Sequence, residues 1–129
     1  MLTHEHLTAR IIKAAFYVHN VLGPGHLEHV YQNALVIVLR REGLQVRTEV
    51  NVPVDFEGVN VGRCESDMIV EHVVVVENKA TLGIMPGHEV RLGAYLNCSG
   101  FQLGLLLNFG PTRVEVKRVE RTREERATG

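Results

Sequence analysis

The pattern of apolar and polar positions predicts three helices along the chain. Over Glu5–Leu22 and again over Leu27–Arg41, apolar residues recur every three or four positions, which is the spacing of an amphipathic helix. Gly23-Pro24-Gly25 separates the two, because glycine adopts positive φ angles and proline cannot continue a helix. Gly43 lies where a cap is expected at the end of the second helix, and a third helix is predicted over Gly87–Cys98.

Extended stretches occupy most of the remaining chain. Alternating valines predict strands over Gln45–Asp55 and Val59–Val70, and a valine-rich run predicts a buried strand over Val73–Lys79. Two more strands, Gln102–Phe109 and Val114–Val119, follow the third helix. The predicted order is helix, helix, three strands, helix, two strands. A helix that crosses over between strands makes the sheet mixed, so the expected fold is α/β (α+β) with helices flanking a central mixed sheet.

Size and composition indicate one ordinary globular domain spanning residues 1–129, with a frayed tail at 120–129. Hydrophobic residues make up 45% of the chain and charged residues 22%. The loop at residues 80–87 is unusually apolar, and we expect it to pack against the protein.

Charge and cysteine content indicate which kinds of binding and which cellular location to expect. Lys and Arg number 14 against 15 Asp and Glu, which does not favour strong non-specific binding to duplex DNA. No apolar run is long enough to span a membrane and no signal peptide is visible, so a cytoplasmic location is expected. The two cysteines, Cys64 and Cys98, fit that location as free thiols.

The most apolar predicted strand ends in charged residues that could take part in catalysis. After Val73–Val76 come Glu77 and Lys79, whose side chains share one face of the strand because they are two residues apart. A tight turn at Glu71-His72 brings the preceding strand back alongside, so Asp67 can lie near both. Carboxylates can hold Mg²⁺, and a nearby lysine can orient water or stabilise an anion, as phosphodiester cleavage requires. The alternative is a solvated ion pair at a strand end.

A set of short motifs resembles a known family. The Gly-x-x-Glu-x-x-Tyr signature of Gly25–Tyr31, together with Asp67, Glu77-Asn78-Lys79 and Leu106–Gly110, resembles the GxxExxY family of the PD-(D/E)XK nuclease superfamily. The resemblance covers roughly Glu5 to Arg118. It implies a PD-(D/E)XK restriction-endonuclease-like core, a Mg²⁺ or Mn²⁺ site and hydrolysis of phosphodiester bonds in nucleic acid. We expect DNA as the substrate in preference to RNA.

The resemblance also implies roles for individual residues. Asp67 and Glu77 would bind the metal, and Lys79 would position the nucleophilic water. Glu28 would add a third carboxylate to the metal site, directly or through water, although a glutamate in the first turn of a helix is also favoured by the helix dipole alone. Tyr31 is expected to be a core residue with a tethered hydroxyl.

The third helix departs from the pattern of similar nucleases, which often carry Gln-x-x-x-Tyr there. This chain has Arg91 and Tyr95, both candidates for substrate binding. An arginine at this position can hold a phosphate through two hydrogen bonds, or it can pair with Glu77 or Asp67 and take the place of the metal.

The histidines do not show the close spacing of a zinc site. His19, near the end of the first helix, is expected to be structural, and His88 is a candidate proton carrier if it reaches the site.

Three functions follow as hypotheses. The first is a metal-dependent nuclease, and the second is a catalytically inactive nuclease-fold module for binding or assembly. The third is a hydrolase of small phosphoesters. We also expect a homodimer, because a chain of this size has little surface for a long substrate.

Overall fold

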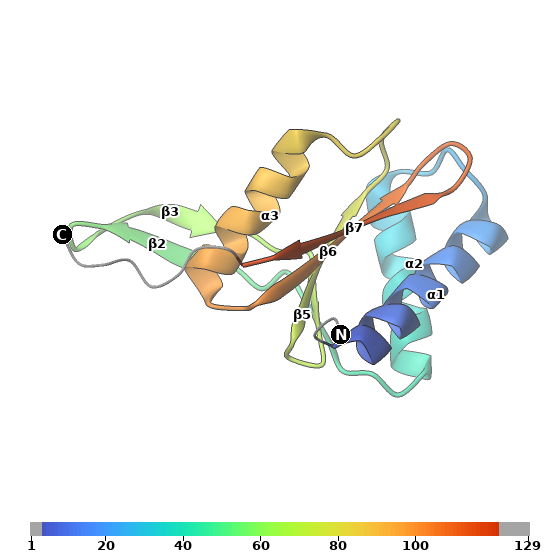
Figure 1. Ribbon diagram of the computed structural model, residues 1–129, viewed down its shortest axis with the longest axis horizontal. Helices are drawn as coiled ribbons and strands as arrows, with labels where there is room; N and C mark the ends of the chain where they lie inside the picture. Colours follow the sequence, from blue (N-terminus) through green and yellow to red (C-terminus); the bar gives the residue numbers. More distant parts are fainter. Residues whose placement is uncertain (1–3, 122–129) are drawn as a thin grey trace.

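The computed structural model describes residues 4–121. Its elements are α1 (Glu5–Leu22), α2 (Glu28–Arg41), β1 (Val46–Thr48), β2 (Val52–Phe56), β3 (Val59–Cys64), β4 (Met68–Val70), β5 (Val74–Lys79), α3 (Pro86–Ser99), β6 (Leu103–Phe109) and β7 (Val114–Glu120). Figure 1 shows α1 and α2 packed together on one side of the sheet and α3 on the other. The predicted helices and the helix-flanked sheet are confirmed.

Glycines end the first two helices, as the sequence predicts. Gly23 has φ 75° and donates its N–H to the His19 carbonyl at 2.8 Å, which closes α1. Gly43 has φ 85° and lies just beyond the end of α2. Both take backbone conformations that a side chain disfavours, so the chain turns at these points.

The main sheet has five strands in the order β1-β4-β5-β6-β7. β5 and β6 are parallel and are joined by the crossover helix α3, whereas the other neighbouring pairs are antiparallel. The sheet is therefore mixed, as expected from a meander followed by a crossover.

Alternate residues of β5 and β6 face opposite cores. Val74 and Val76 pack on the side of α1 and α2, whereas Val75 packs on the side of α3 with Leu92 and Leu106. A strand covered on both faces needs apolar residues at every position, which explains the four consecutive valines. By the same alternation, Glu77 and Lys79 follow Val75 onto the α3 side.

The two long strands expected before β5 are each divided. The first breaks at Glu49, which has φ 53° and whose N–H donates to the Asp67 carbonyl at 2.9 Å. The second breaks between Cys64 and Met68. The three strands expected between the second and third helices are therefore five. The alternating pattern alone does not reveal these breaks, because they depend on which strand each half pairs with.

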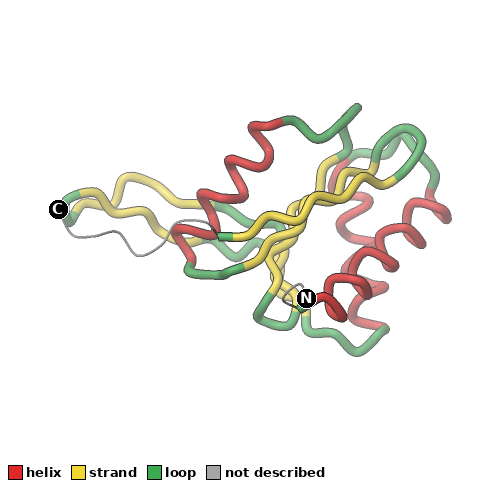
Figure 2. The backbone as a smooth tube through the Cα atoms, in the orientation of Figure 1, coloured by secondary structure: helices red, strands yellow, loops and turns green. Residues whose placement is uncertain are grey.

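β2 is the second half of the first predicted strand, and β3 is the first half of the second. They leave the main sheet and pair only with each other. Figures 1 and 2 show them projecting from the body as a two-stranded arm, which we define as residues 52–64. The register shifts between Val54 and Asp55, next to Pro53, which has no N–H to donate to a regular ladder.

Two expectations about irregular segments have mixed outcomes. Leu82 is 91% exposed and Met85 60% exposed, so these two residues do not pack as expected. Ile84 does contact the core on the α3 side, and Ala80 contacts the core on the side of α1 and α2. β7 continues to Glu120, the first residue of the predicted tail, and residues 122–129 lie outside the described range. Between residues 4 and 121, no helix is both long and apolar enough to cross a membrane.

Candidate active site

A cavity of about 490 Å³ opens where β4 begins and β5 ends, between the start of α2 and the side of α3. It is lined by Glu28, Arg63, Cys64, Glu65, Asp67, Glu77, Lys79, Arg91, Ala94 and Tyr95. Every residue that the sequence nominated for metal or substrate binding is in this set. The structure thus brings together residues that are far apart in sequence.

Asp67 and Glu77 are held against each other by reciprocal hydrogen bonds. The Asp67 backbone N–H donates to Glu77 Oε1 at 3.0 Å, and the Asn78 backbone N–H donates to Asp67 Oδ2 at 2.9 Å. The antiparallel pairing of β4 with β5, which sets Met68 opposite Val76, places the two carboxylates in this position. Each carboxylate is therefore oriented by the backbone of the other strand.

Lys79 lies half-buried in the same cavity. Among the residues that the structure describes, it forms no hydrogen bond or ion pair, yet its charge lowers the pKa of Glu28, Asp67 and Glu77 relative to what burial alone would produce. Its ammonium group is therefore close enough to act on all three carboxylates and has hydrogen-bond donors to offer.

Burial dominates the electrostatics of the carboxylates. Burial, together with the negative charge of Asp67, raises the pKa of Glu77 from 4.5 to about 7, against the opposing effects of the Asp67 backbone N–H and Lys79. Burial also raises the pKa of Asp67 and that of Glu28. The cluster carries more negative charge than its surroundings stabilise, which is the condition that a bound cation relieves.

The donor chemistry fits a hard divalent cation. Carboxylate oxygens are the ligands that Mg²⁺ and Mn²⁺ prefer, and Mg²⁺ often takes only one or two of them together with water and phosphate. Within residues 4–121, no group of three or more His, Cys, Asp or Glu side chains is arranged closely enough to hold a metal ion. The fit is therefore to two direct ligands, Asp67 and Glu77, with Glu28 farther away.

The two residues nominated on α3 differ in their environments. Arg91 is exposed and makes no ion pair with Glu77 or Asp67 in the described part of the chain, so the alternative in which it replaces a metal is not observed. Tyr95 is 2% exposed and donates its hydroxyl to the Val50 carbonyl at 2.6 Å. Its role in substrate binding stays a prediction, since the hydroxyl already has a backbone partner.

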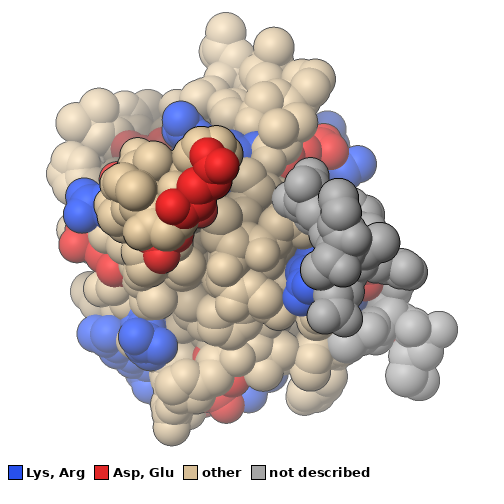
Figure 3. Space-filling view, turned by 90° about the vertical axis from the view of Figure 1, so that its left-hand side faces the viewer, with Lys and Arg blue, Asp and Glu red and all other residues tan. Residues whose placement is uncertain are grey.

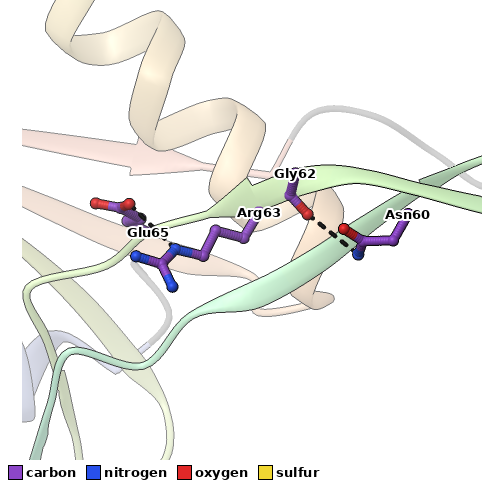
Figure 4. A network of polar contacts seen from close by, with 4 residues as sticks. All are labelled: Asn60, Gly62, Arg63 and Glu65. Carbon is purple, nitrogen blue, oxygen red and sulfur yellow. Dashed lines mark hydrogen bonds and ion pairs between the residues drawn. The ribbon is translucent and has the colours of Figure 1, made fainter.

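Sequence reasoning assigned no role to Arg63, Cys64 or Glu65, which line the cavity from the end of β3. Figure 4 shows Arg63 beside Glu65, with Arg63 Nε 3.3 Å from Glu65 Oε1, and Asn60 donating to the Gly62 carbonyl. Both members of the ion pair are mostly exposed, so Arg63 is free to exchange Glu65 for another anion. Their closeness in sequence to Asp67 is the signal that could have identified them.

Other polar residues near the site are structural. The Tyr31 hydroxyl donates to the Gly23 carbonyl at 2.6 Å, and its ring stacks on Phe109 with centroids 4.6 Å apart. His19 Nε2 lies 2.8 Å from the Gly110 carbonyl oxygen. Both expectations are confirmed. His88 Nδ1 instead accepts the Met85 N–H at 3.0 Å at the start of α3 and does not line the cavity, which argues against a proton carrier.

Solved structures with low sequence identity share this fold. The crystal structure of SSO0001 superposes with a TM-score of 0.61 at 19% identity, covering 74% of this chain and 50% of SSO0001. The alkaline exonuclease LHK-Exo from Laribacter hongkongensis superposes with a TM-score of 0.53 at 12% identity, covering 94% of this chain and 72% of the exonuclease. The chain thus spans half the length of SSO0001. Among curated proteins, none matches this chain.

Family membership rests on the sequence as a whole. Residues 5–119 match the model of the PD-(D/E)XK nuclease superfamily. This span includes all three helices and the whole sheet, except for the last residue of β7. The matched span also contains Glu28, Asp67, Glu77 and Lys79. The chain therefore belongs to the PD-(D/E)XK nuclease superfamily.

Proposed function

We propose that this protein is a nuclease that uses Mg²⁺ or Mn²⁺ to hydrolyse phosphodiester bonds of nucleic acid, DNA in preference to RNA. The observation that carries the proposal is the pairing of Asp67 with Glu77 beside Lys79 in one cavity. Within the superfamily, we assign the chain to the GxxExxY family on its Gly25–Tyr31 signature.

Asp67 and Glu77 would hold the cation, and Glu28 would complete its shell through a water molecule. When bound, the cation neutralises charge on the phosphate and lowers the pKa of a coordinated water. The backbone N–H groups of Asp67 and Asn78 fix the two carboxylates, so little rearrangement is needed on binding.

The basic residues serve the substrate. Lys79 would hold the attacking water and offset the negative charge that develops on the phosphate. Arg91 and Arg63 line the cavity from α3 and from the arm, and guanidinium groups bind phosphate through paired hydrogen bonds. Together they would hold the phosphate over the carboxylates.

Cleavage assays test the proposal. The protein is incubated with single-stranded, duplex and branched DNA, with RNA, and with a small phosphodiester, each in Mg²⁺ or Mn²⁺. We expect cleavage of polymers, and we expect Glu77→Gln and Lys79→Met each to lower the rate by about 100-fold or more. Glu42→Gln and Lys13→Met, which remove the same charges outside the cavity, should retain the wild-type rate.

Other outcomes separate the rival functions. Cleavage of the small phosphodiester alone would favour a phosphoesterase. No cleavage beyond that of the Glu77→Gln and Lys79→Met variants would favour a non-catalytic binding or assembly module. The exposed apolar residues of the arm, Phe56, Val59 and Val61, are the observation that favours the module. A cytoplasmic location and a homodimer remain predictions.

A further inference from the structure

Two thiols from different elements meet at the edge of the cavity. Cys64 ends β3 at the base of the arm, and Cys98 lies in the last turn of α3, 34 residues later. Their Sγ atoms are 2.8 Å apart, and both are free thiols. The chain contains two cysteines, so this pair accounts for all of them.

The surrounding backbone holds both thiols in place. Cys64 pairs with Val52 across the arm, and both pack against the core on the α3 side. The Tyr95 hydroxyl, three residues before Cys98, anchors α3 to the Val50 carbonyl beside the arm. The separation of the two Sγ atoms exceeds a disulfide bond length of about 2.05 Å by less than 1 Å, so a bond requires only small side-chain rotations.

We propose that Cys64 and Cys98 are the site of a reversible intramolecular disulfide, formed by exchange with a low-molecular-weight disulfide, that fastens the arm to α3 beside the cavity. The inference concerns the thiols alone and does not depend on the proposed nuclease activity. Because Cys64 also lines the cavity, the bond would stiffen one of its walls.

Accessibility assigns the order of the exchange. Cys98 is exposed and attacks one sulfur of the oxidant as a thiolate, forming a mixed disulfide and releasing one small thiolate. Cys64 then loses its proton and attacks Cys98 Sγ, which forms the internal bond and releases the second thiolate. Two electrons pass from the cysteines to the oxidant, and two protons follow. Burial, together with the Cys98 thiol, raises the pKa of Cys64 to about 11, consistent with its acting second.

Mass spectrometry tests the bond directly. The full chain is equilibrated in mixtures of reduced and oxidised glutathione, quenched with an alkylating agent and digested with trypsin. We expect a loss of two hydrogen atoms and a cross-linked pair of peptides, residues 64–79 with residues 92–113. Accumulation of glutathione adducts without this loss, or disulfides between two molecules, would overturn the proposal.

Single-thiol variants test the order of attack. In Cys64→Ser, the mixed disulfide on Cys98 has no internal thiol to resolve it, so one glutathione adduct should accumulate. In Cys98→Ser, modification of Cys64 should be at least about 10-fold slower, since that thiol is less exposed and burial raises its pKa. Equal rates for the two variants would contradict the assigned order.

Hydrogen exchange tests whether the bond fastens the arm. In the oxidised protein, the amides of residues 52–64 should exchange more slowly, and the melting temperature should rise by roughly 10 °C. Both effects should reverse with reductant and be absent from the two serine variants under the same oxidation. Unchanged exchange in the arm of a fully oxidised protein would refute the fastening.

Discussion

Glu77 shows how one residue combines burial with chemistry. It follows Val74, Val75 and Val76 into the sheet and is only 8% exposed, yet it carries an ionisable group. Its Oε1 accepts one backbone N–H. Lys79, whose positive charge acts on Glu77, makes no ion pair with it among the described residues. The carboxylate is therefore under-stabilised, and its raised pKa of about 7 expresses this cost.

The first prediction concerns the pH dependence of stability. Between about pH 4.5 and pH 7 the folded state binds more protons at Glu77 than the unfolded state, so the free energy of unfolding falls as pH rises through this range. The fall should be on the order of 3 kcal/mol. Glu77→Gln keeps the hydrogen bond from Asp67 but not the charge, so its urea-unfolding curves should show a clearly smaller fall. An equal fall in both proteins would contradict the raised pKa.

The second prediction concerns metal binding at the same residue. At pH 8, Mg²⁺ or Mn²⁺ at about 100 times its Kd should stabilise the wild type by about 3 kcal/mol in thermal unfolding. Glu77→Gln and Asp67→Asn should lose most of this stabilisation, whereas Glu42→Gln, outside the cavity, should retain it. The same stabilisation in all four proteins would place the cation elsewhere.

At the scale of elements, α3 rests directly on β6. Gly104 of β6 is buried, and a Cβ atom there would lie 2.8 Å from Leu92 Cδ2. The absence of a side chain allows this close approach. Since α3 carries Arg91 and Tyr95, the spacing between these two elements sets the position of one wall of the cavity.

The third prediction follows from this contact. Gly104→Ala should lower the free energy of unfolding by about 1–3 kcal/mol, because the new methyl group displaces Leu92. Gly93→Ala is the matched control: it lies within α3 with nothing within 4 Å of its Cβ position, so it should be neutral or stabilising by up to about 1 kcal/mol. Chemical denaturation of both variants measures the difference, and equal effects would refute the steric argument.

The segment after Lys79 is tied down by one buried amide. Asn108 is 0% exposed, and its Oδ1 accepts the Thr81 N–H at 2.9 Å. Its Nδ2 donates to the Thr81 carbonyl and to Glu115 Oε1, each at 3.0 Å. This network joins the end of β5 to β6 and β7, and it thereby supports the position of Lys79.

The fourth prediction tests that network. Asn108→Ala should cost about 2–3 kcal/mol of stability, because it leaves the polar groups of Thr81 and Glu115 without their partner. Asn97→Ala removes an exposed amide from α3 and should change stability by less than about 0.5 kcal/mol. Thermal unfolding compares the two, and a mild effect at Asn108 would show that the network contributes little.

At the scale of the whole molecule, the arm exposes large apolar residues that do not pack into the core. Phe56 is 63% exposed, Val59 62% and Val61 60%, on a two-stranded ribbon that makes no sheet with the body. Such a ribbon is marginally stable alone and has unpaired edges. Figure 3, which faces the end from which the arm projects, shows acidic side chains (red) at the front. This outer end is therefore unsuited to phosphate, unlike the base of the arm, where Arg63 lines the cavity. A second copy is the partner that we expect.

The fifth prediction is therefore a homodimer that depends on the arm. Sedimentation velocity at micromolar concentration should show dimers for the wild type and a shift toward monomers for Phe56→Ser with Val61→Ser. Val90→Ser removes a residue of α3 that is 73% exposed and should leave the dimer intact. Monomers at every concentration of the wild type would exclude this assembly.

The sequence by itself determined the elements whose signal is local. Helical periodicity, Gly23 and Gly43 at the helix ends, and the continuous valines of β5 each depend on near neighbours along the chain, and the structure confirms them. It also indicated that Asp67 would approach Glu77, because a short turn joins their strands. Only the tertiary structure decided how strand halves separate at Glu49, that β2 and β3 project as an arm, and that Cys64 meets Cys98. These outcomes depend on pairing and packing between distant segments. An alternating or amphipathic pattern does not specify which distant segment a strand or helix contacts.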